Sequence, residues 1–153
     1  ADVFKAEKLI ENNTWQIMLC DSKGETPAGF VKQSEFEYWR ESFKEDKFQF
    51  LLMHHHPIDV GYFIDRHGLT NKESFWQQVS DYPSFKGIAC GHVHNEFCIV
   101  DRTTGVPLYT CPATSMQFAK SMDTVQAESI TPGYRTFEFT NDGQIISKVF
   151  YIS

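Results

Sequence analysis

The sequence has no long apolar run, no block of basic residues and no cysteine framework. No stretch of about 18 consecutive apolar residues occurs, so the sequence predicts no membrane-spanning helix. Lysine and arginine form no run and the net charge is −6, which excludes the basic surface that nucleic-acid binding requires. A phosphate ester would be repelled by such a chain unless bound cations helped.

The cysteines are scattered and too few to staple a small fold. Most of them sit in apolar runs, where buried free thiols are common; they are Cys20, Cys90, Cys98 and Cys111. Residues 1–5 also lack the charged segment and apolar stretch of an export signal. We therefore expect reduced cysteines and a cytoplasmic location.

Length and composition fit one globular domain. Hydrophobic residues make up 41% of the 153 residues, enough for a real core. No internal repeat, low-complexity stretch or linker interrupts the chain, so no domain boundary is expected within residues 1–153.

The first two thirds of the chain alternate between strand and helix patterns. Apolar runs over 15–20, 48–53 and 85–90 predict buried strands. Two amphipathic segments between them predict helices, the first capped by Ser34 and the second by Asn71. This succession predicts an α/β fold, in which ligand sites gather beyond the carboxyl ends of the strands. In the first helix, the residues expected on the wet face are Glu35, Glu37, Arg40 and Glu41.

The last third reads as strands that pair antiparallel. A tight hairpin turn is predicted at residues 141–143, where the sequence is Asn-Asp-Gly. The strand patterns cover 96–101, 106–111, 134–140 and 144–152.

Five of the six histidines fall in two clusters at the ends of predicted strands. His54, His55 and His56 follow the second strand, and His92 and His94 follow the third. Neutral imidazole is a common metal ligand, and histidines two positions apart in extended backbone point to one side. A single histidine at a strand end is usually structural, but two clusters on neighbouring strands predict a metal site.

Other sites can be built from the same residues. Cys90, His92, His94 and Cys98 offer the donors of a structural zinc site, but alternating residues at one strand end wrap a tetrahedron poorly. A cupin-like site would want a glutamate farther along than Glu96. The sequence contains no G-x-S-x-G motif, which argues against nucleophilic serine catalysis. The opposing hypothesis is a metal-free interaction module whose strand-end histidines are remnants.

Two motifs resemble those of the calcineurin-like metallophosphoesterases. The His-x-Pro motif of that family falls on residues 55–57, and Gly-His-x-His falls on residues 91–94. Stretches at 15–22, 64–69 and 132–136 look like the bacterial cyclic-AMP phosphodiesterase branch, so the resemblance spans nearly the whole chain.

The resemblance implies a site with two divalent metals. His55 and His92 would bind one metal and His94 the other, with iron or manganese expected and zinc as an alternative. The substrate would be a 3',5'-cyclic nucleotide such as cyclic AMP, opened to the 5'-monophosphate. His54 and His56 would either orient the ligands or face solvent, and His67 is a weaker candidate for the same pocket.

The resemblance also implies motifs that the sequence lacks. Family members supply further ligands and a leaving-group histidine from Asp-x-His, Gly-Asp and Gly-Asn-His-Asp motifs. Here Gly-Asp and Gly-Asn-His are absent, and Asp-x-His occurs only at residues 65–67, in another context. We therefore expect residues 1–153 to be the C-terminal part of one metallophosphoesterase domain. The chain alone should be inactive and should bind manganese weakly.

The fold implied by the resemblance is half of a two-sheet sandwich flanked by helices. It should contain a mixed sheet and antiparallel C-terminal strands. Because half of a sandwich exposes an apolar sheet face, we expect the chain to self-associate.

Overall fold

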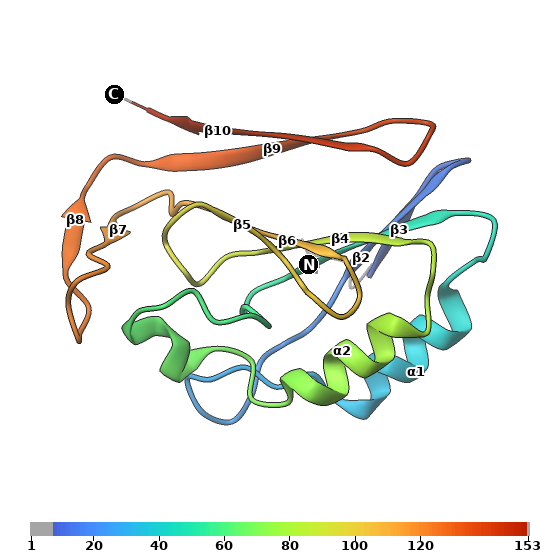
Figure 1. The fold of residues 1–153 in the computed structure, drawn as a ribbon, viewed down its shortest axis with the longest axis horizontal. Coiled ribbons are helices and arrows are strands. Elements are labelled where there is room, and N and C mark those ends of the chain that lie inside the picture. The colour runs from blue at the N-terminus through green and yellow to red at the C-terminus, as the bar shows by residue number, and fades with distance from the viewer. Residues whose placement is uncertain (1–7, 153) are drawn as a thin grey trace, which may run out of the picture.

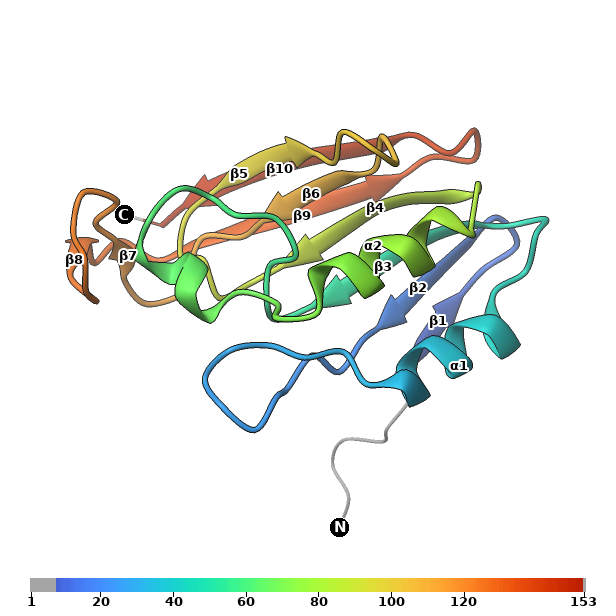
Figure 2. The ribbon, with the colours of Figure 1, turned by 60° about the horizontal axis from the view of Figure 1, so that its bottom comes forward.

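A mixed six-stranded sheet forms the centre of the structure. The computed structural model describes residues 8–152. The strand order is β1-β2-β3-β4-β6-β5, in which β2, β3, β4 and β6 run parallel, while β1 and β5 are antiparallel edge strands (Figures 1 and 2). The strands are β1 (Leu9–Glu11), β2 (Trp15–Leu19), β3 (Phe48–Met53), β4 (Phe85–Cys90), β5 (Phe97–Val100) and β6 (Pro107–Thr110).

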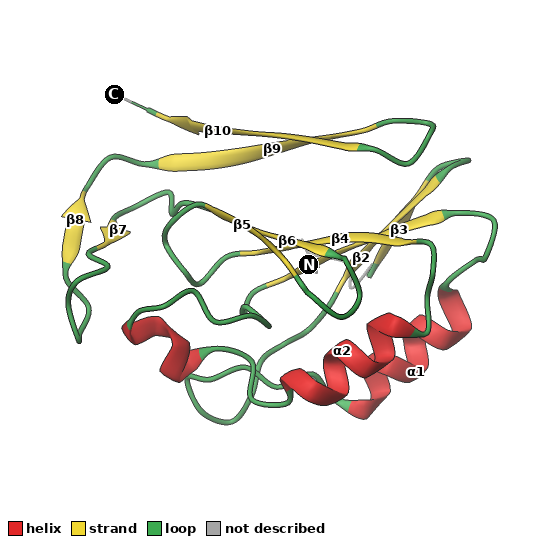
Figure 3. Ribbon diagram, viewed as in Figure 1, coloured by secondary structure: helices red, strands yellow, loops and turns green. Residues whose placement is uncertain are grey.

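Two helices cover one face of this sheet and a β-hairpin covers the other (Figures 1 and 3). The helices are α1 (Gln33–Ser42) and α2 (Lys72–Ser80). The hairpin consists of β9 (Gly133–Phe139) and β10 (Ile145–Tyr151), which pair antiparallel along their whole length. The predicted α/β class, mixed sheet and antiparallel C-terminal strands are thereby confirmed.

A small third sheet and a short 3-10 helix pack against each other. The sheet pairs β7 (Gln117–Phe118) with β8 (Ala127–Ser129), and the 3-10 helix η1 spans Phe63–His67. Phe63 and Phe118 join the two, with ring centroids 5.3 Å apart. This contact ties the segment after β3 to the segment after β6.

The helix-facing core forms because alternate strand residues point to one side of the sheet. Trp39 of α1 and Phe75 of α2 meet edge to face above it, with centroids 5.8 Å apart. The strand residues beneath them are fully buried and come from four neighbouring strands: Met18, Leu51, Ile88 and Leu108.

The opposite face of the sheet is only partly covered by the hairpin. Phe137 and Phe139 of β9 pack on the buried Phe50, with centroids 5.2 and 4.9 Å away. Leu19, farther along β2, stays 37% exposed. Self-association through this face stays a prediction.

Two details of the predicted helices are wrong, the Ser34 cap and the exposed Glu35, whereas the Asn71 cap is right in its position. The first helix begins at Gln33 with Lys32 at the N-cap position, so Ser34 does not cap it. Asn71 is the N-cap residue of α2, but its side-chain amide forms hydrogen bonds with the backbone N–H and carbonyl of Val31 and caps no helix N–H group. Glu35 is buried, because it pairs with Lys8 and accepts the backbone N–H of Asp21.

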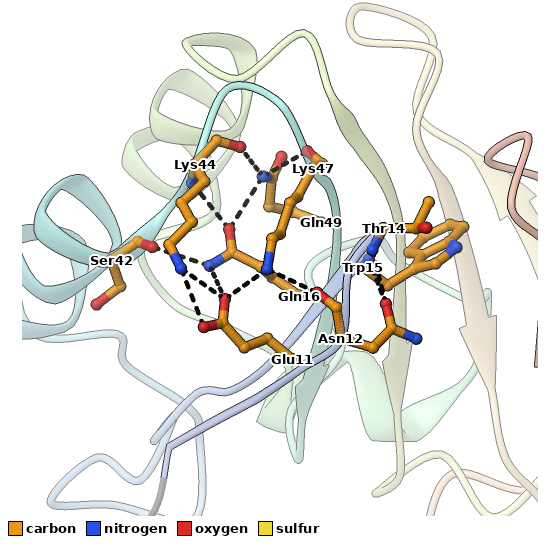
Figure 4. A network of polar contacts seen from close by, with 9 residues as sticks. All are labelled: Glu11, Asn12, Thr14, Trp15, Gln16, Ser42, Lys44, Lys47 and Gln49. Carbon is orange, nitrogen blue, oxygen red and sulfur yellow. Dashed lines mark hydrogen bonds and ion pairs between the residues drawn. The ribbon is translucent and has the colours of Figure 1, made fainter.

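A buried polar network closes the amino end of the sheet (Figure 4). The Gln49 amide donates to the carbonyls of Lys44 and Lys47 at 2.8 and 2.7 Å, and its oxygen accepts from Ser84. Gln16 accepts from the Lys44 backbone N–H at 2.8 Å. The network therefore fixes the turn between α1 and β3 at the end of the sheet away from the histidines.

Replacing Gln49 with leucine should lower the free energy of unfolding by about 1–3 kcal/mol, because the partner carbonyls lose their donor while Gln49 itself is buried. Urea unfolding measures the loss. Gln77→Leu is the matched control, since Gln77 is exposed on α2, and it should change stability by no more than about 0.5 kcal/mol. Equal losses in both variants would contradict a structural role for the network.

All four cysteines are free thiols, with Cys20 and Cys90 buried and Cys98 exposed. Among residues 8–152, no helix is both long and apolar enough to cross a membrane.

Candidate metal centre

The two histidine clusters lie at the same edge of the sheet. Residues 54–56 directly follow β3, and residues 92–94 follow β4 after Gly91. Met53 pairs with Cys90 in the parallel register, so both loops leave the sheet at neighbouring positions (Figure 2). The parallel pairing of β3 with β4 therefore brings the two clusters together.

Three imidazoles converge at this edge. His54, His55 and His92 each place a ring nitrogen within 4.8 Å of the other two. The ring centroids are 4.8 Å apart for His54 and His92 and 4.7 Å apart for His55 and His92. In the described part of the chain, this group contains no cysteine and no carboxylate.

His92 presents a buried nitrogen without a partner. Its Nδ1 lies 3.0 Å from His54 Nε2, so one of these neutral rings donates to the other, while His92 Nε2 has no hydrogen-bond partner. Burial, followed by the neighbouring His54 and His55, lowers the pKa of His92 to about 3. When His92 Nδ1–H is the donor, Nε2 holds a lone pair that can bind a metal.

His55 has partners at both ring nitrogens. Nε2 lies 3.2 Å from the Pro27 carbonyl, which can only accept, so Nε2 carries the proton. Nδ1 then accepts from the Ser22 hydroxyl at 2.9 Å. A metal ion could use His55 only by displacing Ser22 from Nδ1 or Pro27 from Nε2.

The loop after β2 therefore encloses His55. Ser22 also accepts the backbone N–H groups of His54 and His55 at 3.3 and 3.2 Å. Gly29 lies directly against the His55 ring, where a Cβ atom would come within 2.4 Å of Cγ. Burial lowers the pKa of His55, which opposes protonation of the enclosed ring.

His94 lies on the next part of the loop and does not belong to the group of three imidazoles. Its Nδ1 donates to the Met116 carbonyl at 2.9 Å, and its ring stacks on Phe118 at 4.0 Å. A carbonyl partner at Nδ1 leaves the lone pair on Nε2, the arrangement common in metal-ligating histidines. The tautomer thus suits the predicted ligand role.

The backbone of His92 and of His94 is in the left-handed region. The φ angles are 65° at His92 and 54° at His94, where a side chain with a Cβ atom costs about 1–3 kcal/mol per residue. Val93 between them is fully buried. Such strain persists only where surrounding contacts enforce it, and it commonly accompanies ligand-binding turns.

His56 forms a second polar group behind the first. It is fully buried, its Nε2 lies 3.1 Å from Asp65, and its Nδ1 has no partner. The ring stacks on His92 at 5.8 Å. Asp65 also accepts the backbone N–H groups of Val60 and Gly61, both at 2.8 Å, so it fixes His56 and the loop together.

The structure brings some of the predicted site residues together and leaves others apart. His55 and His92 come together, His54 joins them, and His94 lies beside the group on the same turn. His67 is half-buried at the end of η1 and belongs to neither His-containing group of the described chain. Sequence reasoning missed Ser22, Gly29 and Asp65, although Ser22 follows β2 at the same sheet edge as the histidines.

The donors present fit a transition metal in part. An unpartnered buried nitrogen and three neutral imidazoles suit metals that accept nitrogen ligands, such as zinc or iron. Manganese prefers carboxylate oxygen, which this group does not offer. The predicted weakness of the chain alone toward manganese stays a prediction.

Comparison with known proteins supplies the context for this site. No protein-family model matches the chain. A probable cyclic nucleotide phosphodiesterase of Colwellia psychrerythraea is 48% identical over 154 residues, which cover 97% of this chain and 59% of that protein. The 3',5'-cyclic adenosine monophosphate phosphodiesterase CpdA of Vibrio vulnificus is 32% identical over 94% of this chain and 53% of its own length.

The chain is a homologue of cyclic-nucleotide phosphodiesterases. It spans somewhat more than half the length of these curated phosphodiesterases. The predicted resemblance to bacterial cyclic-AMP phosphodiesterases is thereby confirmed. A solved structure described as GAP50, the anchor in the inner membrane complex of Plasmodium, shares the fold with a TM-score of 0.58 at 17% identity, over 91% of this chain and 45% of that one.

Proposed function

We propose that this chain supplies histidine ligands to a dinuclear metal centre that hydrolyses a 3',5'-cyclic nucleotide, with cyclic AMP as the first substrate to test. The observation that carries the proposal is the buried, unpartnered Nε2 of His92 in a group of three imidazoles. The homologous phosphodiesterases supply the substrate class.

His55, His92 and His94 are the proposed ligands. His92 and His94 each have Nδ1 engaged by a neighbour, which leaves Nε2 for a metal. His55 becomes available when the Ser22 loop moves away from its ring. Bound divalent metals, iron or manganese and otherwise zinc, would polarise the phosphoryl oxygens and lower the pKa of a bound water.

His54 and His56 would orient the ligands. With His54 Nε2 as the acceptor, His92 Nδ1 would carry the proton, and this contact would fix the tautomer of His92. His56 is fixed in turn by Asp65 and stacks on His92. Burial lowers the pKa of His54 and of His56, so both stay neutral at neutral pH.

The proposal needs anionic ligands that the group of three imidazoles lacks. We therefore assign activity to a protein that joins this chain to the remaining metallophosphoesterase motifs, and we expect the chain alone to be inactive. The family resemblance does not identify a leaving-group acid among residues 8–152.

The test is metal binding followed by hydrolysis. The untagged chain is titrated with cobalt(II), whose absorption reports nitrogen ligation, and the longer protein is assayed for cyclic AMP hydrolysis. His92→Ala should abolish the cobalt signal and reduce hydrolysis below detection, whereas the control His67→Ala should change neither. Full hydrolysis by the His92 variant would contradict the proposal.

A further inference from the structure

The backbone of the turn that carries His92 and His94 is bound by a hydroxyl group from the other histidine loop. Tyr62 lies in the loop that follows residues 54–56, six residues after His56. Its hydroxyl donates to the carbonyl of Val93, the residue between the two ligand candidates. No other side chain of the described residues donates to that carbonyl.

The same hydroxyl accepts a hydrogen bond, so it is held from both sides. Asn95 is buried and its amide donates to the Tyr62 hydroxyl at 3.1 Å and to the Phe118 carbonyl at 3.0 Å. The backbone carbonyl of Asn95 accepts from the Thr110 hydroxyl at 2.6 Å, which anchors the end of the turn on β6. Burial raises the pKa of Tyr62 to about 12, so the hydroxyl keeps its proton.

These contacts surround a strained segment. His92 and His94 have φ angles of 65° and 54°, and the backbone carbonyl of Val93 between them accepts the Tyr62 hydroxyl. Asp65 fixes the backbone of Val60 and Gly61 immediately before Tyr62, so the hydroxyl is delivered by a loop that is itself anchored.

We propose that Tyr62 is a positioning residue that holds the left-handed turn of residues 92–94 and so aims the Nε2 atoms of His92 and His94. It contacts no metal or substrate atom in this role. It acts through the Val93 carbonyl and Asn95 and links the loop after β3 to the loop after β4.

Tyr62→Phe tests the proposal because it keeps the ring and removes only the hydroxyl. Ring nitrogen NMR signals of His92 and His94 should shift, while those of His67 should stay in place. Cobalt(II) affinity should fall by about 10–100-fold, as for other groups that support metal ligands. Tyr134→Phe is the control, since Tyr134 lies exposed on the hairpin, stacked on Phe150.

Unchanged ring signals of His92 and His94 in Tyr62→Phe would overturn the proposal, as would shifted signals with unaltered cobalt affinity. A lower unfolding midpoint with unmoved rings would show that the hydroxyl only stabilises the fold. The cobalt measurement rests on the proposed function and the NMR measurement does not. If the wild-type chain binds no cobalt, the proposed metal site fails in this chain and the ring signals alone decide the role of Tyr62.

Discussion

Trp39→Ala should lower the free energy of unfolding by about 3–5 kcal/mol, which is the largest stability effect we expect from one substitution. Trp39 is fully buried, and it packs on Phe36, Phe43 and Phe75 with centroid distances of 5.2, 6.0 and 5.8 Å. Alanine leaves a cavity between both helices and the sheet, which the rigid neighbours cannot fill. Urea unfolding followed by fluorescence or circular dichroism measures the loss.

Two further variants separate packing from other effects. Trp39 Nε1 is buried without a hydrogen-bond partner, so Trp39→Phe removes an unpaired donor along with part of the ring and should cost less than half as much. Glu37→Ala on the exposed face of α1 should change stability by no more than about 0.5 kcal/mol. A loss with phenylalanine as large as with alanine would contradict a cavity mechanism.

The fold was predictable where the periodicity of the sequence was strong. The runs at 48–53 and 85–90 match β3 and β4 in full, because buried parallel strands read as continuous apolar stretches. Strands of two or three residues, such as β7 and β8, carry too little pattern to be seen. The helical pattern predicts an exposed Glu35, because its partner Lys8 lies 27 residues away and no local pattern reveals a tertiary ion pair.

The site was predictable only to the level of its loops. Parallel neighbouring strands that each end in histidines must bring those histidines to one edge, and His55 and His92 indeed meet there. The spacing of His92 and His94 predicts two rings on one side of an extended backbone, whereas both residues are left-handed. The His92 ring contacts His54 and the His94 ring contacts the Met116 carbonyl. Ser22 and Asp65 act through distant contacts, which depend on the folded loops.

Gly29→Ala should displace the ring of His55, one of the proposed ligands, without replacing any ligand residue. A Cβ atom at Gly29 would lie 2.4 Å from Cγ and 2.8 Å from Nδ1 of the His55 ring. The backbone of Gly29 is not in the left-handed region, so the effect comes from this clash and not from backbone strain. We expect a stability loss of about 1–3 kcal/mol, a shifted His55 ring signal and weaker cobalt binding.

Gly91→Ala is the matched control at the same site. Gly91 immediately precedes His92, yet its added Cβ would meet nothing closer than His54 Nδ1 at 3.5 Å, an ordinary contact. The same one-carbon change should therefore leave stability and the His55 ring signal nearly unaltered. Because the two glycines flank the histidine group from different loops, a large effect at Gly29 alone would identify the Ser22 loop as the element that sets the position of His55. Equal effects at both would instead mean that the whole edge tolerates no added carbon, and the enclosing role of that loop would be lost.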